Sequence, residues 1–158
     1  MTPAINAARQ AGINYTIHEY RHDPSHSSYG LEAAEKMGVE PARVFKTLIV
    51  ATETRELLVG IVPVTAQLNM KQIAKAAGAK KAAMAAAADV QRSSGYVLGG
   101  VSPLGQKKPL RTFIDVSAQQ FQSIFTSAGR RGLEIELSAT DLAATTRGSF
   151  ASIADEGL

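Results

Sequence analysis

The sequence predicts a single α+β domain in which short helices flank a curved mixed sheet or a small barrel. Three observations favour this class. The chain has 158 residues, of which 45% are hydrophobic and 20% are charged, as in ordinary globular domains. Short helical stretches alternate irregularly with strands rich in β-formers. There is no internal repeat and no linker, so we expect residues 1–158 to form one domain.

The first quarter of the chain alternates helix and strand signals. Thr2 with Pro3 is typical of a helix start, and Gly12 and Gly38 are typical of helix ends. Alternating β-formers indicate a strand, and the segment around Pro24 has loop chemistry. The expected elements are a helix over 4–9, a strand over 14–20, a loop over 22–28 and a helix over 31–37.

The middle of the chain predicts a hairpin followed by two helices. Residues 44–50 and 57–62 are apolar at nearly every position and flank a polar turn, which indicates two strands that are covered on both faces. Alanine-rich composition predicts helices over 69–77, where Gly78 follows, and over 82–92.

The last third of the chain contains strands and one more helix. The expected elements are strands over 110–116 and 123–126 with a helical turn between them, a half-buried strand over 133–137 and a helix over 138–145.

Composition narrows the class of protein. The chain has no cysteine, so it supplies no thiol nucleophile, disulfide or thiolate metal site. No apolar run reaches about 18 residues and the start lacks the features of a signal peptide, so we expect a cytoplasmic protein. The net charge is only +3. Basic clusters attract a polyanion such as RNA if they share a face, or simply keep the protein soluble. These clusters contain Lys71, Lys75, Lys80, Lys81, Lys107, Lys108, Arg111, Arg130 and Arg131.

The three histidines are spaced by four residues, which on one helix would align them like metal ligands. His18 lies in a strand-like run, and Pro24 breaks any helix through His22 and His26. We therefore interpret them as exposed histidines of a strand and a loop rather than as a metal site.

Lys46 is the most informative single residue. On a strand, its side chain shares a face with Val44 and Leu48, so an ammonium group is placed in an apolar stripe. Such a lysine either extends to the surface or lies in a pocket, where it meets an anion or a polarised carbonyl group.

The segment over residues 95–108, GYVLGGVSPLGQKK, is a glycine loop without a standard motif. A phosphate-binding P-loop needs lysine directly after its last glycine, but Gln106 follows Gly105. A hydrolase nucleophile elbow needs a backbone N–H after the serine, and Pro103 has none. Gly99 and Gly100 allow close backbone approach, so the loop is either an anion-binding nest or oxyanion hole, or a plain turn.

Six stretches spread over the whole chain carry a family resemblance. They are MTPAI from Met1, HDP from His22, FKTLIV from Phe45, KQIAKAAGAKK from Lys71, QRSSGYVLGGVSPLGQKK from Gln91 and GRRGLEIEL from Gly129. On these motifs the chain resembles the YbaK-type Cys-tRNA(Pro) deacylases, which are relatives of the editing domain inserted in bacterial prolyl-tRNA synthetases. The resemblance implies the fold of that editing domain.

The resemblance also implies an activity. It is trans-editing of tRNA mischarged with cysteine, on Cys-tRNA(Pro) and by extension Cys-tRNA(Cys), with no metal and no organic cofactor. In the implied mechanism, the substrate thiol attacks its own ester and leaves as a cyclic thioester that water opens. An intramolecular nucleophile in a reactive pose gains an effective molarity of about 10⁵ M or more. The implied partners are aminoacyl-tRNA, especially its acceptor end, and prolyl-tRNA synthetase.

The resemblance finally implies site residues. Lys46 orients the substrate near its terminal adenosine, and backbone groups of Gly99, Gly100 and Val101 approach the ester. The candidate substrate-binding residues are Tyr20, Tyr29, Thr47, Ser102, Ser127 and Glu134. The family often has phenylalanine in place of Tyr29 and aspartate in place of Glu134. Packing or surface roles stay open for the secondary residues, as does a purely structural role for Ser102.

Two other functions stay open on sequence grounds. One is a deacylase for another mischarged tRNA, such as Ala-tRNA(Pro), which would need an enzyme-activated water because alanine brings no thiol. The other is a non-catalytic module that binds aminoacyl-tRNA or a nucleotide, with the glycine loop as an anion nest.

Overall fold

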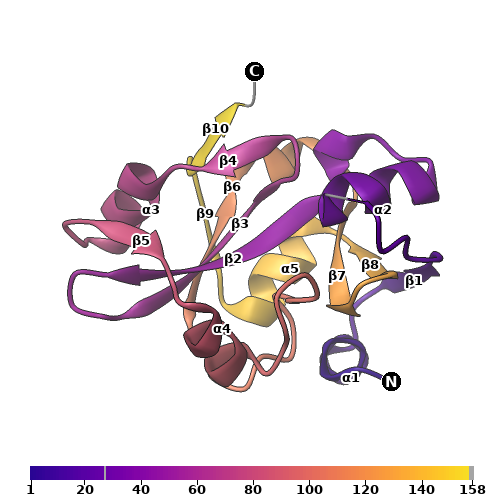
Figure 1. Ribbon diagram of the computed structural model, residues 1–158, viewed down its shortest axis with the longest axis horizontal. Helices are drawn as coiled ribbons and strands as arrows, with labels where there is room; N and C mark the ends of the chain where they lie inside the picture. The colour runs from indigo at the N-terminus through magenta and orange to yellow at the C-terminus, as the bar shows by residue number, and fades with distance from the viewer. Residues whose placement is uncertain (27, 157–158) are drawn as a thin grey trace.

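The computed structural model describes residues 1–26 and 28–156 and is shown in Figure 1. Its helices and 3₁₀ turns are α1 (Pro3–Ala11), α2 (Tyr29–Met37), η1 (Pro41–Arg43), α3 (Met70–Ala77), α4 (Ala87–Ser94), η2 (Val116–Gln120) and α5 (Ala139–Thr146). Its strands are β1 (Tyr15–Glu19), β2 (Phe45–Thr52), β3 (Leu57–Pro63), β4 (Ala66–Leu68), β5 (Ala82–Met84), β6 (Arg111–Asp115), β7 (Ile124–Arg130), β8 (Leu133–Leu137), β9 (Ser149–Ala151) and β10 (Ala154–Glu156).

The strands form mixed sheets in an α+β arrangement, as the sequence predicts. A five-stranded sheet has the order β5-β2-β3-β6-β9, a three-stranded sheet has the order β1-β8-β7, and β10 pairs with β4. Strands β2 and β3 are antiparallel, whereas β6 is parallel to both β3 and β9. The two larger sheets meet at a bridge between Val44 and Phe125. The described strands do not close into a barrel, so the small-barrel alternative is wrong.

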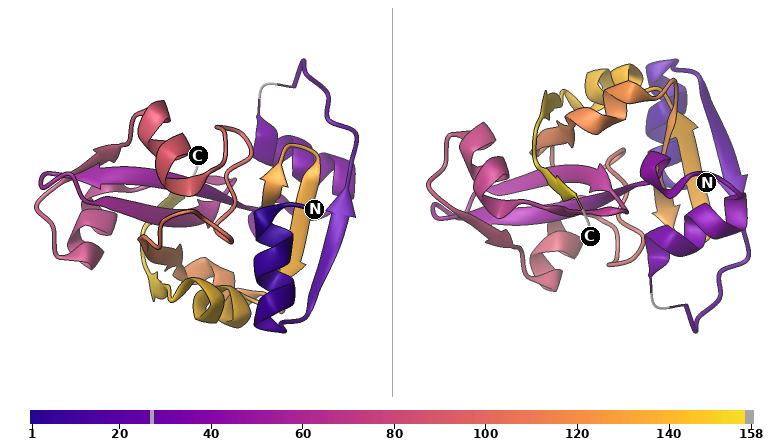
Figure 2. Two further views of the ribbon diagram at one scale, coloured as in Figure 1. Left: turned by 90° about the horizontal axis from the view of Figure 1, so that it is seen from below. Right: turned by 90° about the horizontal axis from the view of Figure 1, so that it is seen from above.

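The two faces of the β2–β3 hairpin pack against different cores. Ile49 and Ile61 belong to the larger core, which also receives Val90 from α4. Val50 belongs to a second core, which receives Ile73 from α3. Accordingly, α3 and α4 lie on opposite faces of the hairpin in both views of Figure 2. This explains why both hairpin strands are apolar at nearly every position.

Local capping chemistry defines the predicted helices. The Thr2 side chain accepts a hydrogen bond from the Ile5 amide at the start of α1, and Asn69 does the same for Gln72 in α3. Gly12, Gly38 and Gly78 adopt left-handed conformations at the ends of α1, α2 and α3. The structure therefore confirms most of the predicted elements, with shifts of a few residues at their ends. They are the helices over 4–9, 31–37, 69–77 and 138–145, the hairpin, and the strands over 14–20, 110–116, 123–126 and 133–137.

One predicted helix is partly wrong. Residues 82–84 form β5, and only residues 87–92 of the expected helix over 82–92 are helical, in a helix that continues to Ser94. Ala83 pairs with Ala51 on β2, so an open strand edge overrides the helix preference of alanine.

The three-residue strands β4, β9 and β10 have no sequence signal. The predicted loop over 22–28 contains no described helix or strand, with residue 27 outside the described residues. In the described ranges, none of the helices is both long and apolar enough to cross a membrane.

Candidate functional site

One cavity gathers most of the predicted site residues. Its volume is about 260 Å³, and it lies between the first half of β2, the start of α2, the glycine loop and the β7–β8 pair. The predicted residues that line it are Tyr20, Tyr29, Lys46, Thr47, Gly99, Val101, Ser127 and Glu134. Gly100 and Ser102 lie outside this lining. We call this cavity the candidate pocket.

The edge of β2 places Lys46 in the candidate pocket. Strand β5 pairs only with Val50–Thr52, so the first half of β2 is not covered by β5. Lys46 is the second residue of β2 and lines the cavity together with Thr47 and Leu48. The edge of β2 that β5 leaves unpaired thus provides one wall of the pocket.

Lys46 carries its charge in a partly dehydrated environment. Burial lowers the pKa of its ammonium group below the usual lysine value. Among the described residues, no carboxylate forms an ion pair with it. A dehydrated ammonium group without a protein counter-ion interacts strongly with an anion or with developing negative charge on a ligand.

Glu134 brings a second ionisable group to the pocket. It lies on β8 opposite Ser127 of β7, and only 7% of its surface is exposed. Burial raises its pKa to about 8. At neutral pH its carboxyl group is therefore mainly protonated, so it can donate a hydrogen bond as well as accept one.

The raised pKa of Glu134 predicts a pH-dependent stability. The folded protein retains a proton up to about pH 8 that the unfolded chain loses near the usual glutamate value of 4.5. This contribution is fully present below pH 4.5 and is lost as the pH rises to 8. We expect wild type to lose on the order of 3 kcal/mol more unfolding free energy than Glu134→Gln between pH 4.5 and 9. Urea unfolding across this range measures the difference, and parallel curves for the two proteins would show that Glu134 ionises normally.

Tyr29 lies between the glycine loop and Arg131. Gly99 has a φ of +91°, and a Cβ atom there would lie 2.6 Å from Tyr29 Cε2. On the ring, the guanidinium carbon of Arg131 lies 3.4 Å from the centroid, as in a cation–π contact. The Tyr29 ring forms the aromatic wall of the pocket. It fits there because Gly99 has no side chain to collide with it, and the guanidinium group of Arg131 stacks on it.

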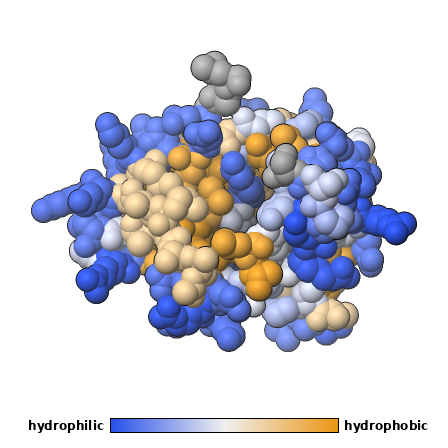
Figure 3. All heavy atoms as spheres, in the orientation of Figure 1, coloured by the Kyte–Doolittle hydropathy of each residue, from blue (hydrophilic) through white to orange (hydrophobic). Residues whose placement is uncertain are grey.

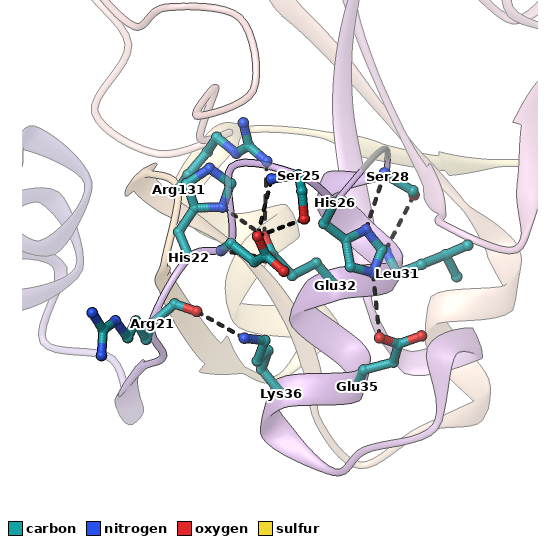
Figure 4. Close-up of polar contacts among 11 residues, drawn as sticks. Arg21, His22, Ser25, His26, Ser28, Leu31, Glu32, Glu35, Lys36 and Arg131 are labelled. Carbon is teal, nitrogen blue, oxygen red and sulfur yellow. Dashed lines mark hydrogen bonds and ion pairs between the residues drawn. The ribbon is translucent and has the colours of Figure 1, made fainter.

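A buried carboxylate supports Arg131 from behind, as Figure 4 shows. Glu32 is fully buried in α2 and accepts hydrogen bonds from the Asp23 amide at 2.6 Å and from His22 Nδ1 at 2.8 Å. Arg131 Nη2 lies 3.8 Å from its Oε1. Burial opposes ionisation, but the hydrogen bonds from Asp23 and His22 outweigh it and hold the pKa of Glu32 below its usual value. The negative charge of Glu32 therefore helps to keep Arg131 over Tyr29.

Sequence reasoning misses Arg131 and Glu32 as site residues. In the sequence, Arg131 is only one member of a basic cluster, and Glu32 belongs to a helix with no special signal. The pair joins residues 99 positions apart, and no local pattern encodes it. The one sequence signal that could have found this pair is the position of Glu32. It lies beside Ala33 and Ala34 on the buried side of α2, and a buried glutamate needs a partner.

The glycine loop is internally bonded behind the pocket. The Gly100 amide donates to the Val97 carbonyl at 3.0 Å, and a Cβ at Gly100 would lie 2.9 Å from Arg130 Cα. Ser102 is fully buried, and its hydroxyl accepts a hydrogen bond from the Leu104 amide. The structure therefore places Gly99 and Val101 at the pocket, whereas Gly100 and Ser102 organise the loop.

The histidines contact separate carboxylates. His18 lies 2.9 Å from Glu136, and His26 lies 3.3 Å from Glu35, both measured between side-chain nitrogen and oxygen atoms. With His22 bound to Glu32, each histidine has its own partner and is partly buried rather than fully exposed. Within residues 1–26 and 28–156, no three histidine or acidic residues gather as a metal site.

The pocket defines a class of protein. It offers a dehydrated ammonium group, a protonated carboxyl group and glycine backbone around a space that admits a small amino acid, and such a site stabilises charge on a small polar ester. Consistent with this class, the chain belongs to the aminoacyl-tRNA editing domain family, whose model matches residues 24–145. It is therefore an aminoacyl-tRNA editing enzyme.

Individual proteins are similar to this chain in sequence or in fold. An Enterococcus faecalis protein named "Putative Cys-tRNA(Pro)/Cys-tRNA(Cys) deacylase EbsC" is 36% identical over 152 residues, which cover 96% of this chain and 92% of that protein. The "Uncharacterized protein YwhH" of Bacillus subtilis is 31% identical over 111 residues, 70% of each. A crystal structure described as "a putative trans-editing enzyme for prolyl tRNA synthetase" has a similar fold, with a TM-score of 0.85 at 20% identity over 97% of this chain and 95% of that one.

Proposed function

We propose that the protein is a single trans-editing domain, formed by residues 1–158, that removes cysteine from Cys-tRNA(Pro) and also acts on Cys-tRNA(Cys). The observation that carries this proposal is Lys46, which lines a pocket of about 260 Å³ together with Glu134, whose pKa burial raises to about 8. The name of the E. faecalis relative, which shares 36% of the aligned residues, supports cysteine as the amino acid.

The lining of the pocket supports a reaction in which the substrate supplies the nucleophile. An enzyme hydroxyl becomes a good nucleophile when a base such as histidine lies beside it. The lining serine and threonine hydroxyls are those of Ser28, Thr47 and Ser127, and among the described residues none is hydrogen-bonded to a histidine side chain. Ser28 contacts His26 only through its backbone amide. A cysteinyl ester brings its own thiol, so positioning and charge stabilisation are sufficient.

The proposed step is balanced within the substrate. The thiol sulfur attacks the ester carbonyl carbon, a carbon–sulfur bond forms, and the bond from that carbon to the terminal ribose oxygen breaks. The thiol proton ends on the released ribose hydroxyl. Water then opens the cyclic thioester and gives free cysteine. Negative charge develops on the carbonyl oxygen and then on the ribose oxygen, and a nearby ammonium group stabilises both.

Each pocket residue has a part in this proposal. Lys46 binds the ester or the adjacent adenosine, and Gly99 and Val101 present backbone close to the ester. Tyr20, Tyr29 and Thr47 surround the amino acid, with Ser127 and Glu134 at its far side. Gly100 and Ser102 contribute by holding the loop.

The proposal extends to partners and location. The acceptor end of the tRNA is the part that carries the ester, so it is the part that enters the pocket. Selectivity for the tRNA body comes from other surfaces or from prolyl-tRNA synthetase as a partner. We place this activity in the cytoplasm, and no step in it uses a metal or an organic cofactor.

A substrate panel tests the proposed function. We expect purified protein to release the amino acid from Cys-tRNA(Pro) at least 100-fold faster than from Ala-, Ser- or Pro-tRNA(Pro), because an intramolecular thiol gains a large effective molarity. Loss of the labelled aminoacyl ester measures the rates. Ser-tRNA(Pro) is the matched control, since it replaces only sulfur by oxygen.

Two outcomes would contradict this proposal. Equal cleavage of the alanyl and cysteinyl esters would show an enzyme-activated water and would favour a deacylase for another amino acid. No cleavage above the buffer rate for any ester would leave a binding module for aminoacyl-tRNA or a nucleotide.

A further inference from the structure

A second candidate binding site lies at the end of the five-stranded sheet that is far from the candidate pocket. Four lysines line an open groove of about 530 Å³ between α3 and the start of β5. We call this feature the lysine groove, and its lysines are Lys71, Lys75, Lys80 and Lys81. All four side chains are exposed. They make up half of the eight lysines of the chain, although they occupy only eleven consecutive positions.

The lysine groove carries a concentrated positive charge. Lys71 and Lys75 are four residues apart on α3 and therefore share one helix face, where like charges repel. Among the described residues, none of the four ammonium groups forms an ion pair. Arg111 is different, because Glu56 binds it at two distances of 2.9 Å. A bound polyanion would relieve the repulsion among the lysines.

The backbone around the groove is held in place by one carboxylate. Glu53 Oε1 accepts hydrogen bonds from the amides of Lys80 at 3.0 Å and Lys81 at 3.3 Å. Gly78 ends α3 just before them in a left-handed conformation. These contacts use main-chain groups, so the lysine side chains stay available for a ligand.

Strand β2 connects the lysine groove with the candidate pocket. Lys46 is near its start, and Thr52 at its end pairs with Ala82, which follows Lys81 directly. At about 3.3 Å per residue, this part of β2 spans about 20 Å. Figure 1 shows α3 and β5 at one end of the molecule and α2 at the other. A ligand that reaches both sites must therefore be long, which excludes a free amino acid or a single nucleotide.

The surface between the two sites is apolar. Met84, Val97 and Leu98 are exposed by 51%, 59% and 61%. Figure 3 shows an area of apolar residues on this face that extends over β5, with hydrophilic residues around its outer edge. Nucleotide bases that leave a helix gain from contact with apolar surface, whereas phosphates need cations.

From this arrangement we infer that the lysine groove binds the phosphate backbone of the RNA whose 3′ end enters the candidate pocket. This inference rests on the proposed function. The groove contributes affinity for the RNA that does not depend on base sequence, because ammonium groups contact phosphates rather than base edges. The candidate pocket then reads only the amino acid and its ester.

The test compares two charge-matched variants. K80Q/K81Q removes two charges from the groove, and R9Q/K36Q removes two charges from exposed positions outside the groove and the pocket. The quadruple K71Q/K75Q/K80Q/K81Q extends the series. We measure the Kd for uncharged tRNA by filter binding from 50 to 200 mM salt, and kcat/KM on intact Cys-tRNA(Pro) and on a short cysteinyl trinucleotide ester. Thermal unfolding checks that each variant is folded.

We expect the quadruple variant to weaken tRNA binding about tenfold or more at low salt. The slope of log Kd against log salt should become shallower by about 0.7–0.9 for each phosphate that the variant no longer neutralises. The decrease in kcat/KM should appear on intact tRNA as a higher KM and should be absent on the short ester. R9Q/K36Q should change the slope much less.

Three results would overturn the inference. They are an unchanged salt slope in the quadruple variant, a loss of affinity in R9Q/K36Q equal to that in K80Q/K81Q, and a decrease in kcat/KM on the short ester equal to that on intact tRNA. The binding measurement keeps the two proposals separate. If wild type cleaves no ester, the proposed function fails, and the binding of uncharged tRNA still decides whether the lysine groove holds RNA.

Discussion

Lys46→Met should lower kcat/KM on Cys-tRNA(Pro) by about 10²–10³-fold, with most of the loss in kcat. Methionine keeps the apolar stem of the side chain and removes the ammonium group that we propose to contact the ester. Removing one preorganised group that stabilises developing charge has effects of this size in other enzymes. Single-turnover deacylation measures the chemical step without contributions from product release.

Two further variants make this result specific. Lys36→Met applies the same substitution to an exposed lysine of α2 and should leave the rate unchanged. Lys46→Arg keeps the charge but not the shape, and it should recover only part of the activity. If Lys46→Met unfolds at the wild-type temperature and retains full turnover, Lys46 takes no part in the reaction and the proposed role is wrong.

Much of the fold could be predicted because its signals are local. Capping residues such as Thr2 and the glycines after α1, α2 and α3 mark helix ends within a few positions. The apolar stripe around Lys46 likewise singles it out in one strand. These features depend only on neighbours along the chain, so a single sequence contains them.

The missed features depend on interactions between distant segments. Residues 82–84 join a sheet only because the last part of β2 leaves an edge for them, and alanine composition alone favours a helix. Arg131 becomes a pocket residue because Glu32, on another element, lies 3.8 Å from it. The separate roles of Gly99 and Gly100 also follow from what packs against each, namely Tyr29 and the Arg130 backbone.

Gly99→Ala should reduce kcat/KM by about 100-fold, because the new methyl group would lie 2.6 Å from Tyr29 Cε2 and must displace the aromatic wall of the pocket. Alanine also adopts a positive φ at a cost of about 1–2 kcal/mol. Gly95→Ala is the matched control. Its φ is +83°, so it bears the same backbone cost, but its Cβ meets only the flexible side chain of Lys107 at 3.2 Å. Both variants should show the backbone cost in urea unfolding, and only Gly99→Ala should lose activity.

A double-mutant cycle separates displacement of Tyr29 from distortion of the loop itself. Tyr29→Ala removes the ring that the new methyl group would strike. If Gly99 acts through Tyr29, the double variant Gly99→Ala/Tyr29→Ala should be about as active as Tyr29→Ala alone. If the two losses instead multiply, the Gly99 backbone acts on the ester directly, as the glycine loop of an oxyanion-binding site does. Either pattern identifies the group that faces the substrate, because one mechanism predicts strong coupling between the two residues and the other predicts none.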